Sequence, residues 1–318
     1  MPELPEVETV RRELEAGSAR RGPSPIGKRI EKVVVSAPEV IGLPGSVDAF
    51  VERLAGRTIE RIGRRGKYLI VHLSEGDLVV HLRMSGDLRV RSADAVRGDE
   101  VRDAGPGGTA VVRDAADGGA DVDRTAETGE ENVVQAAGNE KTAPPPRVWL
   151  TLEDGSELQF HSTRKLSRIY AADHHDEVTG DLGPEPLDDS FGPADLAALL
   201  YRSTRNLKSF LLDQHLIAGV GNIYASEILF AARLHPDRLA GSLNTAEVEA
   251  LWQSMRSVFG DAVEAAGTSI DYAYEGGGYQ DRLQVYGFEG EPCPACGMAI
   301  TRIVQNARST YCCPNCQQ

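Results

Sequence analysis

The sequence predicts an α+β protein in which an antiparallel β domain is followed by a helical domain and a metal-binding tail. Short β-branched runs separated by Gly and Asp turns fill residues 30–91 and 147–161. Helical periodicity dominates residues 192–267, and all five cysteines fall between residues 293 and 316. At 318 residues the chain is long enough for several domains, each with its own core.

The first residues, MPELPEVETV, begin a helix predicted over residues 5–16. Apolar residues recur there at steps of three and four, at Leu4, Val7, Val10 and Leu14. Pro5 suits the first helical position, where its missing N–H costs nothing, and Gly17 is a typical stop. We therefore expect a helix directly at the start of the chain.

A series of strand patterns follows this helix. They are IEKVVVSA, RTIERIG, KYLIVHL, DLVVHLRM and DLRVR, and a hairpin is predicted in RVWLTLEDGSELQFH. Residues 92–146 interrupt the series with 12 acidic residues, 5 basic residues and no aromatic residue. Because such a composition buries little apolar surface, we predict a disordered acidic insertion in the β domain.

The pattern changes at DHHDEVTGDLGPEPLDD, where Pro, Gly and Asp indicate a linker. The helical segments that follow are GPADLAALLYRS, NLKSFLLDQ, GNIYASEILFAARL and TAEVEALWQSMRSVFGDAVEAAG. We therefore divide the chain into a β domain of residues 1–172, a linker of 173–186, a helical domain of 187–288 and a cysteine tail of 289–318.

The net charge of −14 argues at first against a nucleic-acid partner, because such proteins usually carry a basic surface. Residues 92–146 hold half of that charge, however, and a global charge does not exclude a local basic groove. Two basic turns favour a groove: RIGRRGKYL, with Arg61, Arg64, Arg65 and Lys67, and STRKLSR, with Arg164, Lys165 and Arg168. The alternative is that each turn is an ordinary solvated face.

No apolar run approaches 18 residues and no signal-peptide pattern is present, so we expect a cytoplasmic protein.

Two Cys-x2-Cys motifs, CPAC and CPNC, are separated by sixteen residues in the tail. Four thiolates at this spacing predict one zinc ion held by Cys293, Cys296, Cys313 and Cys316. A four-cysteine site is closed, so this zinc is structural rather than catalytic. The alternatives are chance pairs or a redox motif, but so short a tail would hardly fold without metal. Cys312 adjoins Cys313 and would point away from the ion.

Pro2 and Glu3 offer a possible reaction at the start of the chain. If Met1 is removed, Pro2 carries a free secondary amine, a fraction of which is neutral and nucleophilic near neutral pH. Its attack on an aldehyde carbon gives a cationic iminium, an electron sink for elimination, and the neighbouring Glu3 can transfer protons. Glu6 lies in the first helical turn, where the helix dipole favours its anion. The alternative, which composition alone favours, is that Pro2 is incidental and the glutamates only favour the helix start.

The stretch GVGNIYASEILF, residues 219–230, is a candidate phosphate site. Gly219 and Gly221 predict a tight turn, and a helix beginning near Asn222 would expose N–H groups. Because Gly-x-Gly turns are common, the better indication of DNA binding is the helix–turn–helix pattern formed with NLKSFLLDQHLIA. In the tail, Arg308 is either a solvated charge or a phosphate contact.

These motifs together resemble the formamidopyrimidine-DNA glycosylase family, bacterial enzymes that remove oxidised purines. The matching stretches are MPELPEVETVRREL, RRGKYL, HLRMSGDLRV, NLKSFLLDQ, GVGNIYASEILFAARLHPDR, QVYGFEGEPCPACG and RSTYCCPNCQ. The resemblance implies an N-terminal helix on a β-sandwich, a helix–two-turn–helix domain and a zinc-finger hairpin, with double-stranded DNA in the cleft between them. It also implies a monomeric, nucleoid-associated enzyme of base-excision repair that acts on oxidised bases and abasic sites.

The resemblance implies roles for individual residues. Pro2 would attack C1′ of the damaged nucleotide, Glu3 would donate and accept protons, and β- and δ-elimination would follow base loss. Phosphate contacts are implied for Lys67, His81, Asn222 and Arg308, of which Lys67 and Arg308 would lie at the reaction centre. Positions near the flipped base are implied for Glu6, Lys208 and Glu227. Met84 would fill the place of that base in the stack.

Three departures from the family pattern bear on lesion preference. STRKLS stands where the family has an Asp-Pro-Arg-Arg-Phe segment, so that Arg164 remains as a DNA contact while Leu166 replaces the aromatic wedge. The loop GTSIDYAYEGGGYQ is short, and Ala307 replaces the usual glycine before the finger arginine.

Two other functions fit part of the sequence. An endonuclease VIII-like enzyme would prefer oxidised pyrimidines, but that branch usually has glycine where this chain has Leu4. A non-catalytic relative would bind damaged DNA only, yet it would have no need of Pro2, Glu3 and Lys67.

Overall fold

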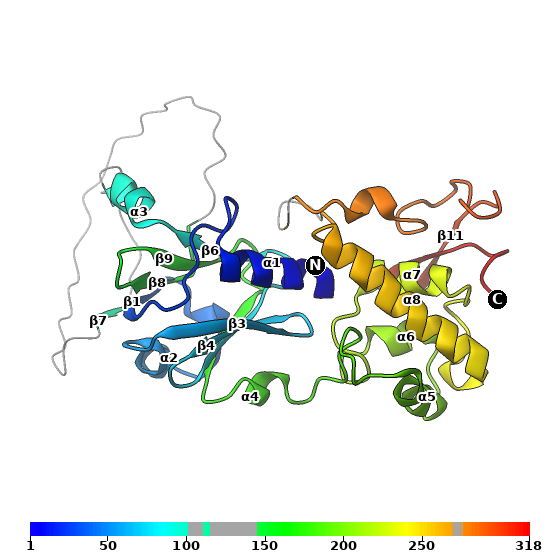
Figure 1. Cartoon of the computed structure of the whole chain (residues 1–318), viewed down its shortest axis with the longest axis horizontal. Coiled ribbons are helices and arrows are strands. Elements are labelled where there is room, and N and C mark those ends of the chain that lie inside the picture. Colours follow the sequence, from blue (N-terminus) through cyan, green and yellow to red (C-terminus); the bar gives the residue numbers. More distant parts are fainter. Residues whose placement is uncertain (101–110, 115–144, 270–273, 275) are drawn as a thin grey trace.

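The computed structural model describes residues 1–100, 111–114, 145–269, 274 and 276–318 (Figure 1). The first part contains α1 (Leu4–Ala16), β1 (Ile30–Val35), η1 (Pro38–Val40), β2 (Ile41–Leu43), α2 (Val47–Leu54), β3 (Ile59–Arg65), β4 (Tyr68–Leu73), β5 (Asp77–His81), β6 (Gly86–Arg91), α3 (Ala93–Glu100), β7 (Val111–Asp114), β8 (Val148–Leu152), β9 (Glu157–Ser162) and β10 (Arg168–Ala172). The second contains α4 (Asp176–Thr179), α5 (Pro193–Tyr201), α6 (Leu207–Leu212), α7 (Asn222–Ala231), η2 (Ala240–Ser242), α8 (Thr245–Glu264), η4 (Tyr279–Arg282), β11 (Thr301–Gln305) and β12 (Arg308–Cys312).

Over the described ranges, the β domain is a sandwich of two five-stranded sheets, with strand orders β6-β9-β8-β1-β7 and β2-β10-β5-β4-β3. The strands pair antiparallel except for β2, which runs parallel to β10. Residues at alternating positions, such as Leu88 and Val90 of β6, face one core between the sheets. The predicted antiparallel β domain is therefore confirmed.

The interruption at residues 92–146 is partly regular. Helix α3 follows β6 directly, and β7 pairs antiparallel with the edge of β1, with Val112 opposite Val34. The prediction of a disordered insertion is wrong for these two elements, because a Val-Val run can extend a sheet at an open edge strand. The rest of the predicted insertion lies outside the described residues.

The helical domain packs α5 to α8 around a second core, in which Tyr224, Phe210 and Phe259 are fully buried. Helix α8 begins with a capping box, in which the side chains of Asn244 and Glu247 each accept from the other residue's backbone N–H. Strands β11 and β12 form the hairpin of the cysteine tail. Among the described helices, none is both long and apolar enough to cross a membrane.

Helix α1 belongs to both domains. Val7, Val10 and Leu14 are part of the sandwich core, whereas Leu4 is part of the core of the helical domain. Figure 1 accordingly shows the N-terminal end of α1 directed at α7 and α8. Residues 2 and 3 therefore lie where the two domains meet.

Candidate active site

The turn before α7 receives the start of the chain. The backbone N–H of Leu4 donates to the carbonyl of Gly219 at 3.1 Å. Gly219 has φ +88°, and a Cβ there would lie 2.7 Å from Cδ1 of Leu4. Both the backbone angle and the close approach require glycine, so the Gly-x-Gly pattern marks a docking point for the N-terminus.

The carboxylate of Glu3 lies at the N-terminus of α7. Its Oε1 accepts from the backbone N–H of Ile223 at 3.0 Å and its Oε2 from that of Tyr224 at 3.4 Å. A Cβ on Gly221 would lie 2.1 Å from Cδ of Glu3, so only glycine leaves room for the carboxylate. The free N–H groups expected here therefore bind a protein carboxylate, which the helix dipole stabilises as an anion.

Pro2 is buried beside Glu3, while Met1 is exposed. Glu3 is the N-cap residue of α1, and its own backbone N–H donates to Oε2 of Glu6 at 2.8 Å. This hydrogen bond fixes the direction in which the chain leaves α1 toward Pro2. Rotation about Pro2 is limited further by its ring.

Glu6 is fully buried and joins α1 to the helical domain. Its Oε1 accepts from the hydroxyl of Tyr224 at 2.6 Å and from the backbone N–H of Thr268 at 2.7 Å. Burial and the nearby Glu3 raise the pKa of Glu6 to about 7, against the hydrogen bonds from Tyr224 and Thr268, which lower it. Thr268 lies in the loop GTSIDYAYEGGGYQ, of which residues 270–273 and 275 lie outside the described residues.

Two buried lysines bind backbone carbonyls of the turn before α7. Nζ of Lys67, from the turn between β3 and β4, donates to Val220 O at 2.8 Å. Nζ of Lys208, on α6, donates to Asn222 O at 3.1 Å and to Ser226 Oγ at 2.7 Å. Burial lowers the pKa of each lysine to about 8, although the negative Glu3 opposes the shift.

The side chain of Asn222 connects the turn to the finger hairpin. Its Nδ2 donates to Ser309 O at 2.9 Å, and its Oδ1 is buried without a hydrogen-bond partner among the described atoms. Arg308, next to Ser309, lowers the pKa of both Lys67 and Lys208, so its guanidinium acts on the same site. Asn306 and Ala307 have φ of 50° and 57° in the hairpin turn, the conformation for which glycine is the usual residue.

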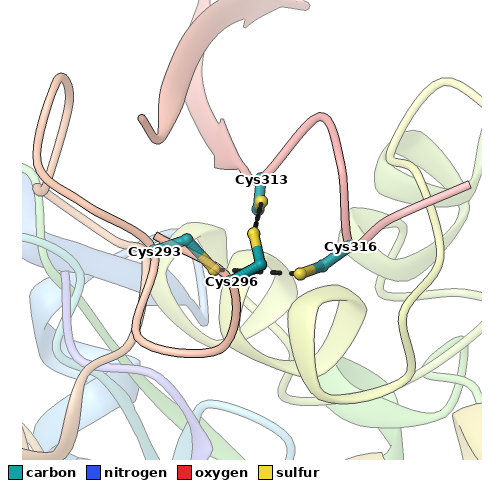
Figure 2. Close-up of side chains that lie close together, drawn as sticks. All are labelled: Cys293, Cys296, Cys313 and Cys316. Atoms are coloured by element: carbon teal, nitrogen blue, oxygen red, sulfur yellow. Dashed lines mark hydrogen bonds between the residues drawn. The ribbon is translucent and has the colours of Figure 1, made fainter. Parts of the chain in front are cut away.

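The four cysteines expected to bind zinc lie together in the finger (Figure 2). One ligand atom from each of Cys293, Cys296, Cys313 and Cys316 lies within 4.8 Å of the others. Four thiols at this separation fit one tetrahedral Zn²⁺, so the tail has one structural zinc site. Cys312 is buried outside this cluster, with Sγ 3.5 Å from Thr301 Oγ1.

The residues expected to enter DNA lie on neighbouring loops of the sandwich. Met84 and Leu166 are each 47% exposed, and Arg164 is exposed and donates its backbone N–H to Ser85 Oγ. His81, at the end of β5, packs edge-on against Tyr68. Burial, with Arg83 and Lys67, lowers the pKa of His81 to about 3, so its imidazole is neutral at physiological pH.

Two arginines of the basic turn RIGRRGKYL form ion pairs within the chain. Arg64 and Arg65 both bind the carboxylate of Glu185, and Arg64 also binds Glu8. These two arginines therefore tie the sandwich to the connection between the domains. In the second basic turn, Lys165 pairs with Glu39.

Glu227 anchors the connection to the finger. Its two oxygens accept from the backbone N–H groups of Gln284, Val285 and Tyr286 at 2.8 to 3.0 Å. Burial raises the pKa of Glu227, and these hydrogen bonds oppose the shift. The resemblance implied that Glu227 lies near the flipped base, and it did not predict these three backbone partners.

Some residues of the site had no sequence signal. Gln214 accepts from Gly219 N at 3.0 Å and donates to Val220 O at 2.8 Å, so it holds the same turn as Lys67. The sequence predicts only that Tyr224 lies in a helix. Its hydroxyl partner, Glu6, lies 218 residues away, and no local pattern reports so distant a contact.

Known proteins are similar to this chain in sequence and in fold. Family models match residues 1–169 (formamidopyrimidine-DNA glycosylase N-terminal domain), 182–273 (formamidopyrimidine-DNA glycosylase H2TH domain) and 290–318 (zinc finger found in FPG and IleRS). The formamidopyrimidine-DNA glycosylases of Pelotomaculum thermopropionicum and Geobacillus kaustophilus are 37% and 36% identical, covering 100% of this chain and 99% and 100% of the relatives. The Lactococcus lactis Fpg (MutM) structure with N7-benzyl-Fapy-dG DNA matches at TM-score 0.76 and 30% identity over 100% of both chains, and its complex with abasic-site DNA at 0.75 and 30% over 99% of both.

Proposed function

Because the chain belongs to the formamidopyrimidine-DNA glycosylase family, it is a DNA glycosylase of base-excision repair, and we propose that it removes oxidised purines and then cleaves the DNA strand at the abasic site. The proposed lesions are 8-oxoguanine and formamidopyrimidines. The Lactococcus lactis relative, which covers the whole chain, was solved with Fapy-type and abasic DNA, which supports both substrates. We also propose the domain limits at residues 172, 186 and 288.

One observation carries the proposal: the turn at residues 219–222 gathers the N-terminus and three of the side chains to which we assign roles in the reaction. The N-terminus docks on Gly219, Glu3 caps α7, and Lys67 and Lys208 bind carbonyls of the turn. These groups come from three separate segments of the chain and meet on a fourth, the turn itself. A purely structural helix start would not require two buried lysines around one buried carboxylate, since burying charges is costly.

In the first step, the Pro2 nitrogen attacks C1′ of the damaged nucleotide. The base leaves with the electron pair of its bond and takes up a proton from the solvent, and the proton of the amine passes to Glu3. Glu3 returns that proton to O4′ as the C1′–O4′ bond opens, and the nitrogen lone pair forms the C=N bond. Because a secondary amine then has no N–H left, the product is a cationic iminium.

The iminium drives cleavage of the strand. It withdraws electrons from C2′, and loss of a C2′ proton expels the 3′-phosphate. A second elimination expels the 5′-phosphate and leaves a one-nucleotide gap with phosphates at both ends. Lys67, whose pKa of about 8 leaves it mostly protonated near pH 7, would neutralise these phosphates together with Arg308.

The base must leave the stack before Pro2 can reach C1′. Met84 and Leu166, both exposed, would fill the gap, and Arg164 would face the unpaired partner base. Glu6, through Thr268, would position the loop over the extruded base. His81 and Asn222 would bind the backbone beside it.

The proposal is tested with duplexes that each carry one lesion: 8-oxoguanine, a formamidopyrimidine, an oxidised pyrimidine or an abasic site. Intact mass must first show that the protein begins at Pro2, because the nitrogen is an amide while Met1 is attached. We expect faster excision of the purine lesions, β,δ-elimination products, and a covalent adduct on borohydride reduction. Preference for the oxidised pyrimidine would overturn the proposed substrate class. Tight binding without an adduct would overturn the proposed covalent mechanism.

A further inference from the structure

We propose that this chain binds a second divalent transition-metal ion, of the Zn²⁺ class, between Asp77, His174 and His175 at the start of the connection between its domains. This site is separate from the finger and from the Pro2 site. It uses residues of the linker pattern DHHDEVTG that the repair function leaves unexplained. One ligand atom from each of the three residues lies within 4.8 Å of the others.

The sheet register creates the cluster. Asp77, the first residue of β5, pairs with His72 of β4 on one side and with Ala172 of β10 on the other. The chain leaves the sheet after Ala172, so the next residues lie beside the end of β5. His174 and His175 are therefore brought to Asp77 by backbone pairing, which makes their proximity a fixed feature of the fold.

The carboxylate of Asp77 is held in place from two sides. Nδ1 of His72 lies 2.7 Å from Oδ1, and the backbone N–H of His175 donates to Oδ2 at 2.7 Å. The Asp77 side chain is only 7% exposed. Each carboxylate oxygen has a further lone pair, so a metal can bind without breaking these contacts. His72 then acts as a positioning residue for the ligand carboxylate, as is usual around metal ligands.

The two histidines are oriented in a similar way. Nδ1 of His175 lies 3.0 Å from Oγ1 of Thr179, and Nδ1 of His174 lies 3.1 Å from Oδ2 of Asp176. These contacts leave Nε2 of each ring for the metal. The rings lie 4.4 Å apart between centroids, and His174 is 64% exposed, which gives an ion access from solvent and gives the ring freedom to close on it.

The ligand set selects the type of metal. Two imidazoles and one carboxylate suit Zn²⁺ and its neighbours in the first transition row, whereas Mg²⁺ and Ca²⁺ prefer oxygen ligands alone. A bound ion would join the end of one sheet to residues 174 and 175. The same connection is held further along by Arg65, whose Nη2 donates to Leu182 O and Gly183 O.

The test uses the full chain with its finger loaded with one zinc per molecule, titrated with Co²⁺ and followed by calorimetry and visible absorption. We expect a second equivalent to bind, with weak d–d bands and without a thiolate-to-cobalt charge-transfer band. The double variant His174→Ala/His175→Ala should bind it about tenfold or more weakly, and His72→Ala about tenfold more weakly. Since the side chain of His174 is largely exposed, the double variant should stay folded, which its melting curve checks.

The matched control is His215→Ala, which removes an exposed histidine outside the cluster and should leave cobalt binding unchanged. Asp77→Asn, which removes the negative charge of the third ligand, should also weaken cobalt binding by about tenfold or more. Its control is Asp173→Asn, because Asp173 is an exposed neighbour that is not among the three ligands. Three results would each overturn the proposal: no second equivalent, uptake with only thiolate bands, or equal affinity in the double variant and in His215→Ala.

Discussion

The proposed reaction centre, which is buried, and the exposed loops that we propose face the DNA are built in opposite ways. Glu3 is 3% exposed, and both of its carboxylate oxygens accept backbone hydrogen bonds before any substrate is present. Met84 and Leu166, by contrast, project large apolar side chains that are each 47% exposed. Chemistry benefits from groups fixed in advance, whereas groups that enter the DNA stack find their partners only in the complex.

This difference predicts which step of the reaction a mutation in each region should affect. A change in the reaction centre should affect the chemical step strongly and also disturb the interface between the domains, because the same contacts serve both. A change in the exposed loops should affect only the step in which the base leaves the stack.

The largest effect is expected for Glu3→Gln. Glutamine keeps an oxygen for the N–H of Ile223 but cannot transfer the proton, so single-turnover base removal should fall by about 10³-fold. The control is Glu15→Gln, at the exposed end of the same helix, which should retain full activity. A Glu3→Gln rate within about tenfold of the wild type would show that Glu3 only caps α7.

A single added methyl group should have the next largest effect. In Gly221→Ala the new Cβ would lie 2.1 Å from Cδ of Glu3, so the carboxylate must move, and we expect a loss of about 10²-fold in single-turnover rate. Gly260→Ala is the matched control, because a Cβ there meets no atom within 4 Å and lies in helix α8. It should leave activity unchanged and raise the unfolding free energy by about 0.5–1 kcal/mol. Equal rates in the two variants would contradict the close packing of Glu3 on the turn.

The sequence predicted the local parts of this centre well. Cysteine spacing defined the finger, and the Gly-x-Gly turn marked the start of α7 at Asn222. Apolar periodicity predicted a helix over residues 5–16, and α1 begins one residue earlier, at Leu4. Each of these signals depends on neighbours in the chain or on the requirement of one ion for four thiolates.

What the sequence could not predict are partners brought together only by the fold. Arg64 and Arg65 read as a phosphate-binding turn, yet they pair with Glu185, some 120 residues later. The burial of Lys208 and the approach of His174 to Asp77 likewise depend on tertiary packing and sheet register. A charge in a sequence does not reveal whether its partner is another part of the chain or a ligand.

Removal of the zinc should unfold the finger and leave the β-sandwich folded. Chelation should unfold the hairpin of β11 and β12, withdraw Arg308 from the site and weaken binding to lesion DNA by about tenfold or more, measured by fluorescence anisotropy at fixed salt. The far-ultraviolet signal of the sandwich should persist. Unchanged DNA affinity after verified zinc loss would refute the assignment of the finger to DNA binding.

The smallest effect is expected in the exposed loops. Met84→Ala should slow removal of 8-oxoguanine from duplex DNA by up to about tenfold, because a shorter side chain fills the stack less well. Borohydride trapping on a preformed abasic site, where no base must leave, should change less. The control is Met298→Ala, an equally exposed methionine on the finger. Equal slowing on both substrates would place Met84 in the chemical step and remove the distinction between the two regions.

The most direct test of the central claim is the location of the covalent adduct. Two lysines with a pKa of about 8, Lys67 and Lys208, are the competing amines closest in character to the N-terminal one. Mass spectrometry of the proteolysed, borohydride-reduced complex with abasic DNA identifies the modified residue. We predict the modification on the peptide that begins at Pro2, on its α-nitrogen; a modification on Lys67 or Lys208 instead would contradict the account.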